Sequence, residues 1–194
     1  MVGARIIGVY GVRVALLALM ASCALPAAAA ARRVEVGLES QAYPTGVIGA
    51  ASVRLPVAGR HRIGFRAGYN RARRSDNGEH DDERGGGPGI GAAYRFGLRP
   101  EARGLFFGAR VDLWWLEIDW TDDPGLTTEV RGSTDILVLQ PTGEVGWRFT
   151  FGSEMRWAVE PSVALGAEIN VRTEGEDVGE GAILLGGVAV TYRF

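Results

Sequence analysis

Hydrophobic and polar residues alternate with a period of two through most of the chain from Val34 to Phe194. Segments of about ten residues carry apolar side chains at every second position, with small or charged residues between them. Turn-forming Gly, Pro, Asn and Asp separate these segments. Neighbouring residues of a strand point to opposite sides, so this period indicates strands with one apolar face and not helices.

The alternation predicts about eight strands joined in chain order. Short links are expected at 56–60, 99–103 and 150–154, and mostly longer loops at 71–89, 120–132 and 172–181. Links that alternate in this way are typical of an up-and-down antiparallel meander whose two ends differ. The glycine-rich stretch Gly85–Gly91 leads into a strand and not into a helix N-terminus, so we interpret it as a loop hinge and not as a phosphate loop. The expected strands cover residues 34–42, 47–55, 62–70, 90–98, 105–115, 137–148, 156–169 and 184–194.

An apolar strand face can point into the core of a soluble barrel or out into lipid, and three observations favour lipid. Aromatic residues of the apolar face gather near the two ends of the strands, where lipid headgroups would lie. A closed barrel has no free sheet edge, which a bilayer does not tolerate. Charges on the opposite face nearly balance, as a narrow interior requires. These inward charges are Arg54, Arg62, Arg66, Arg95, Arg110, Arg148 and Arg193, with Glu35, Glu39, Asp112, Glu144, Glu160 and Glu168.

The fold class predicted is therefore all-β: an eight-stranded antiparallel up-and-down transmembrane β-barrel. A soluble periplasmic barrel with the same number of strands is the alternative. Within the membrane barrel we expect an interior ion network. Its members are Arg110, Asp112, Glu144, Arg148, Glu160, Glu168 and Arg193.

Composition and charge argue against a collagen-like protein and against a nucleic-acid-binding protein. The chain has 194 residues, enough for one domain, and its 29 glycines show no collagen period. A formal net charge of −2 gives no reason to expect nucleic acid as a partner.

The N-terminal residues read as a secretory signal. Arg5 and Arg13 precede and flank a short apolar core, Pro26 follows it, and the alanines up to Ala31 form a small-residue cleavage region. We therefore expect a signal peptide at 1–31, which directs export, and a barrel domain at 32–194. The only cysteine, Cys23, lies in the expected signal, in a stretch that resembles a bacterial lipobox and would make it a lipid anchor.

The C-terminus carries the most specific motif. Val188, Val190 and Tyr192 continue one face of the last strand, and Phe194 ends the chain. This ending resembles the C-terminal signature of bacterial outer-membrane β-barrel proteins, and the chain from residue 32 resembles the small eight-stranded barrels of the OmpA, OmpX and OmpW kind. The resemblance implies an integral outer-membrane location, contact with outer-membrane lipid and lipopolysaccharide, and recognition of these four residues by the barrel-assembly machinery.

Candidate chemistry is sparse. Lipid A-modifying barrels, which the resemblance includes, use a His paired with a Ser. His61 and His80 are followed by other residues, and we interpret both as solvated surface histidines. No Gly-x-Ser-x-Gly or His-Glu-x-x-His motif occurs. Acidic residues of the long loops could bind divalent cations, but their spacing matches no EF-hand. We predict no catalytic, cofactor-binding or metal-binding residues.

The predicted barrel and its loops lead to three hypotheses about function. The first hypothesis is a non-enzymatic, monomeric outer-membrane barrel that contributes to envelope integrity or surface interaction through its external loops. The second is a narrow transporter for small hydrophobic molecules, although the inward face is expected to be charged along most strands. The third is a lipid A-modifying enzyme. A general porin is excluded, because the side chains of an eight-stranded barrel fill its interior.

Overall fold

The computed structural model describes residues 34–75, 78–99 and 103–194, with the side chain of Ala58 left out. The expected signal peptide at 1–31, including Cys23, lies outside the described residues. Eight strands and one 3-10 turn, η2, form the described part. Their bounds are β1 Glu35–Tyr43, β2 Gly46–Ala58, β3 His61–Ser75, β4 Asp82–Gly97, β5 Gly104–Asp122, β6 Val130–Phe151, η2 Ser153–Met155, β7 Trp157–Glu174 and β8 Gly181–Arg193.

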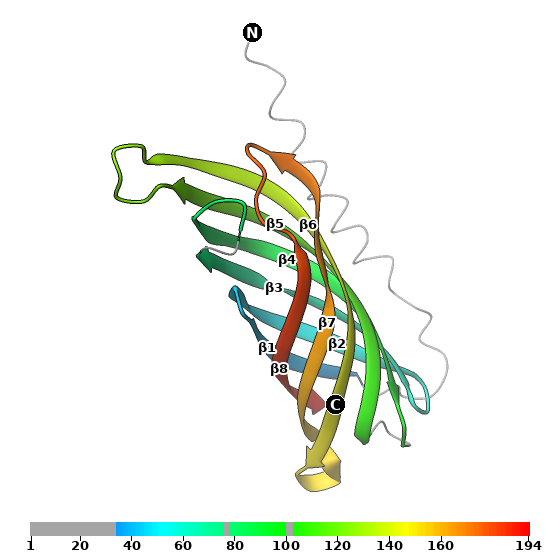
Figure 1. Cartoon of the computed structure of the whole chain (residues 1–194). Helices are drawn as coiled ribbons and strands as arrows, with labels where there is room; N and C mark the ends of the chain where they lie inside the picture. The colour runs from blue at the N-terminus through cyan, green and yellow to red at the C-terminus, as the bar shows by residue number, and fades with distance from the viewer. Residues whose placement is uncertain (1–33, 76–77, 100–102) are drawn as a thin grey trace. The chain divides into compact units, whose positions relative to one another are not determined.

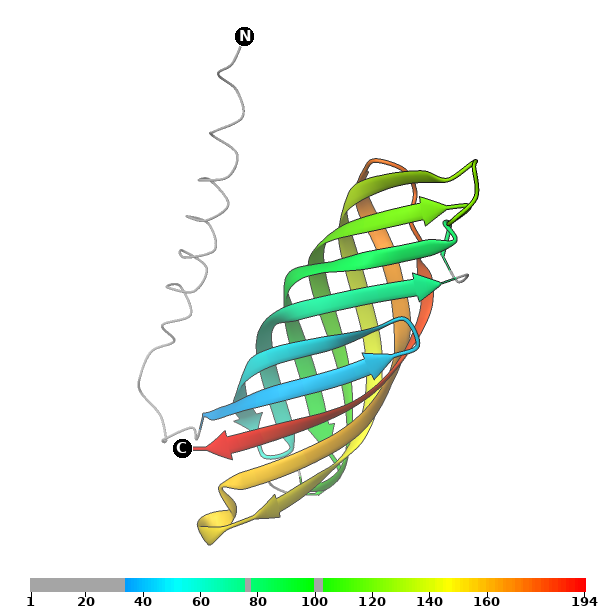
Figure 2. The same ribbon diagram turned by 90° about the vertical axis from the view of Figure 1, so that its left-hand side faces the viewer.

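The strands close into a barrel in simple chain order. Each pairs antiparallel with its sequence neighbours, and β8 pairs with β1 to complete the ring. Figure 1 and Figure 2 show the eight strands wound around one axis, with the first strand (blue) beside the last (red). The eight-stranded antiparallel up-and-down barrel predicted from the alternation is confirmed. Among the described residues, no helix is long and apolar enough to cross a membrane.

The two faces of the sheet have opposite chemistry. Apolar side chains point outward and stay exposed, as at Leu38 (71% exposed) and Leu165 (64%). Charged side chains at the intervening positions point inward and are buried, Glu160 among them at 3% exposed. A water-soluble protein would bury the first set and expose the second, so this arrangement places hydrocarbon around the barrel wall.

The prediction of a long loop at 71–89 is wrong. Strand β3 continues to Ser75 and β4 begins at Asp82, with Arg74 opposite Glu83 in the ladder. The glycines here lie inside β4 because the neighbouring strand comes close: a Cβ at Gly87 would lie 1.7 Å from the carbonyl oxygen of Trp115. Glycine therefore serves close packing at this point and not a hinge.

Other connections are also shorter than expected. The loop between β5 and β6 covers only 123–129, and that between β7 and β8 only 175–180. Strand β2 extends through Pro56 to Ala58, because a register shift there takes up the proline, which lacks the amide hydrogen a regular ladder needs. The strands reach beyond the apolar segments that the alternation detects.

Candidate functional site

A closed ring of alternating charges fills the lower half of the interior, toward the end with short links. Each of its four arginines contacts two of its four carboxylates. We call these eight residues the ion ring. Going round it, they are Glu160, Arg54, Glu39, Arg66, Asp112, Arg110, Glu144 and Arg95.

The geometry of the ion ring combines bidentate and bridging contacts. Arg66 binds both oxygens of Asp112, with Nε–Oδ1 at 2.7 Å and Nη2–Oδ2 at 2.8 Å. Its Nη1 lies 3.4 Å from Glu39, which also accepts from Arg54 at 2.6 Å. Arg110 joins Asp112 (2.9 Å) to Glu144 (3.5 Å). Paired in this way, each buried charge keeps opposite charges beside it in place of water.

A branch leaves the ion ring at Glu160. Arg148 contacts Glu160 and also binds both oxygens of Glu35, at 2.9 and 3.0 Å. Arg62 lies 3.5 Å from Glu35 at the end of this branch. The ring and branch tie seven of the eight strands together through side chains, β8 being the exception among the described residues.

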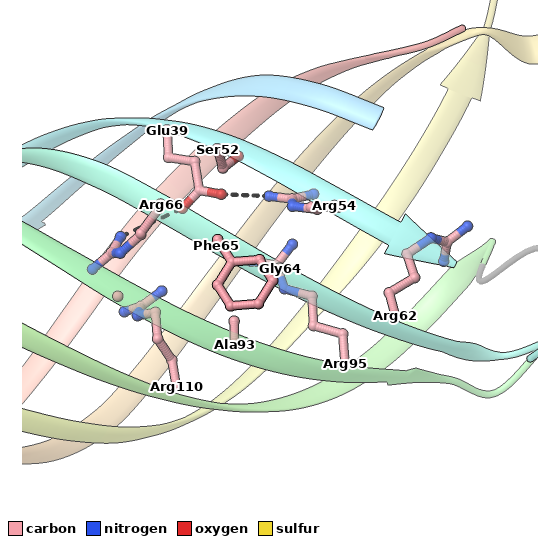
Figure 3. Close-up of a pocket in the computed structure, with 11 residues that line it drawn as sticks. Glu39, Ser52, Arg54, Arg62, Gly64, Phe65, Arg66, Ala93, Arg95 and Arg110 are labelled. Atoms are coloured by element: carbon pink, nitrogen blue, oxygen red, sulfur yellow. Dashed lines mark hydrogen bonds and ion pairs between the residues drawn. The ribbon is translucent and has the colours of Figure 1, made fainter. Parts of the chain in front are cut away.

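Arginines from neighbouring strands converge on a small space inside the barrel. Figure 3 shows Arg54, Arg66, Arg95 and Arg110 around it, from β2, β3, β4 and β5, with Glu39 between Arg54 and Arg66 and with Arg62 farther to one side. The hollow they line measures only about 10 Å³, about one water molecule. The charged side chains thus occupy the lumen at this level.

Aromatic rings lie against the ion ring on two sides. The Arg66 guanidinium carbon is 5.6 Å from the centre of the Trp114 ring, and that of Arg95 is 4.8 Å from the centre of Phe106. Both rings are buried. Contacts of cations with ring faces stabilise charges that are shielded from water.

Large apolar side chains fill much of the upper half of the interior, where only charged and small side chains were expected. The outer parts of β5 and β6 turn large apolar side chains inward, because the inward positions of those segments carry them. The buried apolar cluster consists of Tyr43, Ile48, Ala72, Trp114, Leu116, Ile118, Trp120, Ile136, Val138, Ala164, Val178, Ile183 and Leu185. The interior is therefore layered, with a charged lower half and an apolar cluster above it.

A second ion cluster lies near the outer ends of the strands. Arg74 binds Glu83 at 3.0 Å and Glu168 at 2.9 Å, and we call these three residues the upper triad. Gln140 connects it to the layer below, since its amide donates to Glu168 and its oxygen accepts from the Trp114 ring nitrogen. With the upper triad included, the interior holds seven paired arginines and seven carboxylates.

Glu83 also fastens two loops. It is 1% exposed and accepts hydrogen bonds from the backbone N–H of Glu79, His80 and Gly179. The neighbouring Val178 is buried in the apolar cluster, so the loop 175–180 folds inward over the upper interior. The Glu83 carboxylate thus holds the loop 175–180 in place over the upper end of the interior.

Of the two histidines expected to be solvated, His80 is largely buried instead. His80 stacks on Trp120 with ring centres 4.0 Å apart, and its Nδ1 lies 3.0 Å from Asp122. Its side chain is 11% exposed, so the interpretation of His80 as solvated is wrong. The hydrogen bond from His80 lowers the pKa of Asp122 below its ordinary value. His61, at the short-link end, contacts the Tyr94 hydroxyl at 2.5 Å.

The predicted network residues separate into three groups. Arg110, Asp112, Glu144 and Glu160 belong to the ion ring, and Arg148 to its branch. Glu168 belongs to the upper triad instead. Arg193 joins neither: it is part-exposed and donates to the backbone oxygens of Glu154 and Met155 at the turn between β6 and β7.

Sequence reasoning missed Arg74 and Glu83 because both fell in the expected loop. Continuing the alternation would have found them. Arg74 keeps the inward parity of Arg66, and Glu83 keeps that of Arg95. Counting every second residue along a strand therefore identifies inward-facing residues even where the apolar residues of the opposite face have ended.

The C-terminal residues line up on the outer face. Val188 and Val190 are exposed on β8, and Tyr192 lies between the rings of Trp157 and Phe194, with centres 4.9 and 5.0 Å away. Phe194 donates its backbone N–H to Val34, next to the start of β1. Recognition of this segment by the assembly machinery stays a prediction.

Among the described residues, no group of three or more His, Cys, Asp or Glu side chains could hold a metal ion. The acidic residues of the upper loops are spread over separate contacts. Glu83 belongs to the upper triad, Asp122 contacts His80, and Glu180 accepts from the backbone N–H of Asn170.

Comparison with known proteins gives one family and several distant structures. A family model described as the autotransporter beta-domain matches residues 37–174, which run from the first strand to the seventh. The N-terminal β-barrel domain of Pseudomonas aeruginosa OprF is 15% identical, with 84% of this chain and 98% of that chain covered and a TM-score of 0.47. Neisserial surface protein A is 11% identical, with coverage of 84% and 95% and a TM-score of 0.48. The attachment invasion locus protein Ail of Yersinia pestis is 11% identical, with coverage of 84% and 97% and a TM-score of 0.45. No curated protein matches the chain.

Proposed function

Because this chain belongs to the autotransporter beta-domain family and forms an eight-stranded outer-membrane barrel, we propose that it is a non-enzymatic membrane anchor whose external loops serve envelope integrity or surface interaction. It reaches the outer membrane through the signal peptide at 1–31, folds with the help of the barrel-assembly machinery, and stays monomeric.

The observation that carries this proposal is the filled interior. The ion ring occupies the lower half, and the hollow among its arginines is only about 10 Å³. The apolar cluster and the loop 175–180 occupy the upper half. A wall held this rigidly positions its loops but offers no wide path for solutes.

Electrophoresis and conductance test the proposal together. The folded barrel is expected to migrate differently before and after boiling, and to give no stable single-channel conductance in planar bilayers. A steady open channel of porin size would contradict the anchor role. Mass spectrometry of lipid A from cells with and without the gene tests the non-enzymatic part, for which identical lipid A is expected.

A narrow transporter for small hydrophobic molecules is the second candidate, and the apolar upper interior favours it. Leu116, Ile118 and Ile136 lie in this layer, under the loop that Val178 anchors. Movement of that loop would expose an apolar surface. Uptake of a small apolar dye into vesicles that contain the barrel would support this candidate, whereas uptake equal to empty vesicles would exclude it.

A further inference from the structure

A polar groove lies on the outer wall of the barrel, across β3, β4 and β5. It is open to the outside and has a volume of about 600 Å³, and six side chains with polar groups border it. They are Tyr69, Arg71, Arg73, Arg84, Glu117 and Asp119. We call this feature the arginine groove. It is separate from the interior, because these six side chains all point outward.

The arginine groove begins where the apolar wall ends. On β3 the outward positions Ile63, Phe65 and Tyr69 are followed by Arg71 and Arg73. On β5, outward Val111 and Trp115 are followed by Glu117 and Asp119. Exposed Tyr and Trp rings at such a boundary mark the level of lipid headgroups. The groove lies toward the end of β5 that leads into 123–129, the longest connection between the strands, and the longer loops of outer-membrane barrels face the outside.

Two arginines of this groove, Arg73 and Arg84, meet across neighbouring strands. Arg73 is directly opposite Arg84 in the β3–β4 ladder, an arrangement that destabilises a sheet by itself. Arg84 contacts Asp82, but neither Arg71 nor Arg73 has an ion-pair partner among the described residues. Arg71 is opposite Gly86, where a Cβ would lie only 2.4 Å from the carbonyl oxygen of Asn70 and 3.0 Å from the Tyr69 ring.

Strand β5 contributes two hydrogen-bond acceptors to the arginine groove, the carboxylates of Glu117 and Asp119. Glu117 is opposite Gly86 and Asp119 is opposite Arg84, so both carboxylates face the same space from β5. A bare anion would be repelled by them. A ligand that combines phosphate with sugar hydroxyls fits both sets of groups, because guanidinium forks bind phosphate and carboxylates accept from hydroxyls.

We propose that the arginine groove binds the phosphorylated sugar headgroup of a glycolipid in the outer leaflet. Arg71 and Arg73 bind its phosphate, Arg84 adds positive charge, and Glu117 and Asp119 accept hydrogen bonds from its hydroxyls. The acyl chains lie along the apolar wall below Tyr69. This inference rests on the proposed function, since it needs the barrel to span the membrane with its longer loops outside.

Native mass spectrometry of the full barrel, refolded in detergent, tests the site with diphosphoryl lipid A as probe. The variant is the double substitution Arg71→Gln and Arg73→Gln. The matched control is Arg131→Gln with Arg172→Gln, which removes two outward arginines that pair with Glu129 and Glu174 elsewhere on the wall. We expect roughly tenfold weaker lipid A binding for the groove variant and less than about twofold for the control. Equal losses, or no loss in the groove variant, would overturn the proposal.

Two further probes, phosphatidylglycerol and inorganic phosphate, distinguish a glycolipid from other sources of the phosphate group. Phosphatidylglycerol is expected to bind more weakly than lipid A and to respond little to the groove substitutions; equal binding would reduce the site to general attraction of anionic lipid. Displacement of lipid A by millimolar inorganic phosphate would also contradict a glycolipid site. Vesicle flotation and heat-dependent migration are measured for every variant. A barrel that inserts but shows no lipid A preference refutes only the groove, whereas a barrel that does not insert refutes the proposed function as well.

Discussion

Replacement of Glu160 by Gln tests whether the ion ring holds the barrel together. The Glu160 carboxylate is 3% exposed and contacts Arg54, Arg95 and Arg148. Each arginine keeps one other carboxylate, which limits the loss. Removing one partner from a buried ion pair costs about 3–5 kcal/mol, so we expect a loss near the lower end, about 3 kcal/mol.

Urea unfolding in lipid vesicles, followed by tryptophan fluorescence, measures this loss. With a slope of about 1–3 kcal/mol per molar urea, the midpoint should fall by roughly 1–3 M. Glu174→Gln is the control, because Glu174 pairs with Arg172 in an exposed contact worth at most about 1 kcal/mol. A midpoint for Glu160→Gln that equals the control's would refute the structural role of the ring.

A double-mutant cycle sharpens the same test. Glu160→Gln leaves the interior with surplus positive charge, and adding Arg95→Gln removes one of the arginines that lost one of its two partners. The double variant should therefore be less destabilised than the sum of the two single variants, by at least about 1 kcal/mol. Strict additivity would show that the two charges do not interact.

Three further outcomes follow from other parts of the barrel. Glu83→Gln should loosen the loop 175–180, because the carboxylate that accepts from Gly179 becomes a weaker acceptor; amide exchange should speed up more in that loop than in the strands. Phe194→Ala should slow assembly in cells while leaving refolding into detergent nearly unchanged, as measured by heat-dependent migration. The contact of Asp122 with His80 lowers the pKa of the carboxyl below its ordinary 3.8, so its contribution is present above that pH and is lost as the pH falls through the lowered value. Titration followed by NMR should show this contact intact at pH 5, and Asp122→Asn should remove the pH dependence.

Much of the architecture could be predicted from alternation alone. The period of two gives the strand number and the order, and it gives the inward direction of residues such as Arg66 and Glu160. It works because a membrane barrel has two chemically different faces along every strand. The same parity extends into Arg74 and Glu83, although the local hydrophobicity that defines a segment has ended there.

Other features depend on distances that the sequence does not contain. The length of β4 depends on how closely the glycines approach Trp115, which is a property of the folded sheet. The partners in the ion ring depend on the barrel's stagger, which brings Arg54 to Glu160 across 106 residues of chain. Arg193 has inward parity, but it lies at the barrel end, where backbone oxygens of the turn are nearer than any carboxylate. The arginine groove likewise needs three strands to be placed side by side.

The central claim is that hydrocarbon surrounds the apolar face of the strands. A spin-label scan along β7 in vesicles measures this directly, since the barrel residues 34–194 contain no cysteine and each label is unique. Labels at outward Val163 and Leu165 should be accessible to oxygen and protected from a water-soluble nickel reagent, while the label at inward Ala164 should be protected from both. High accessibility of the outward labels to the nickel reagent would contradict the account.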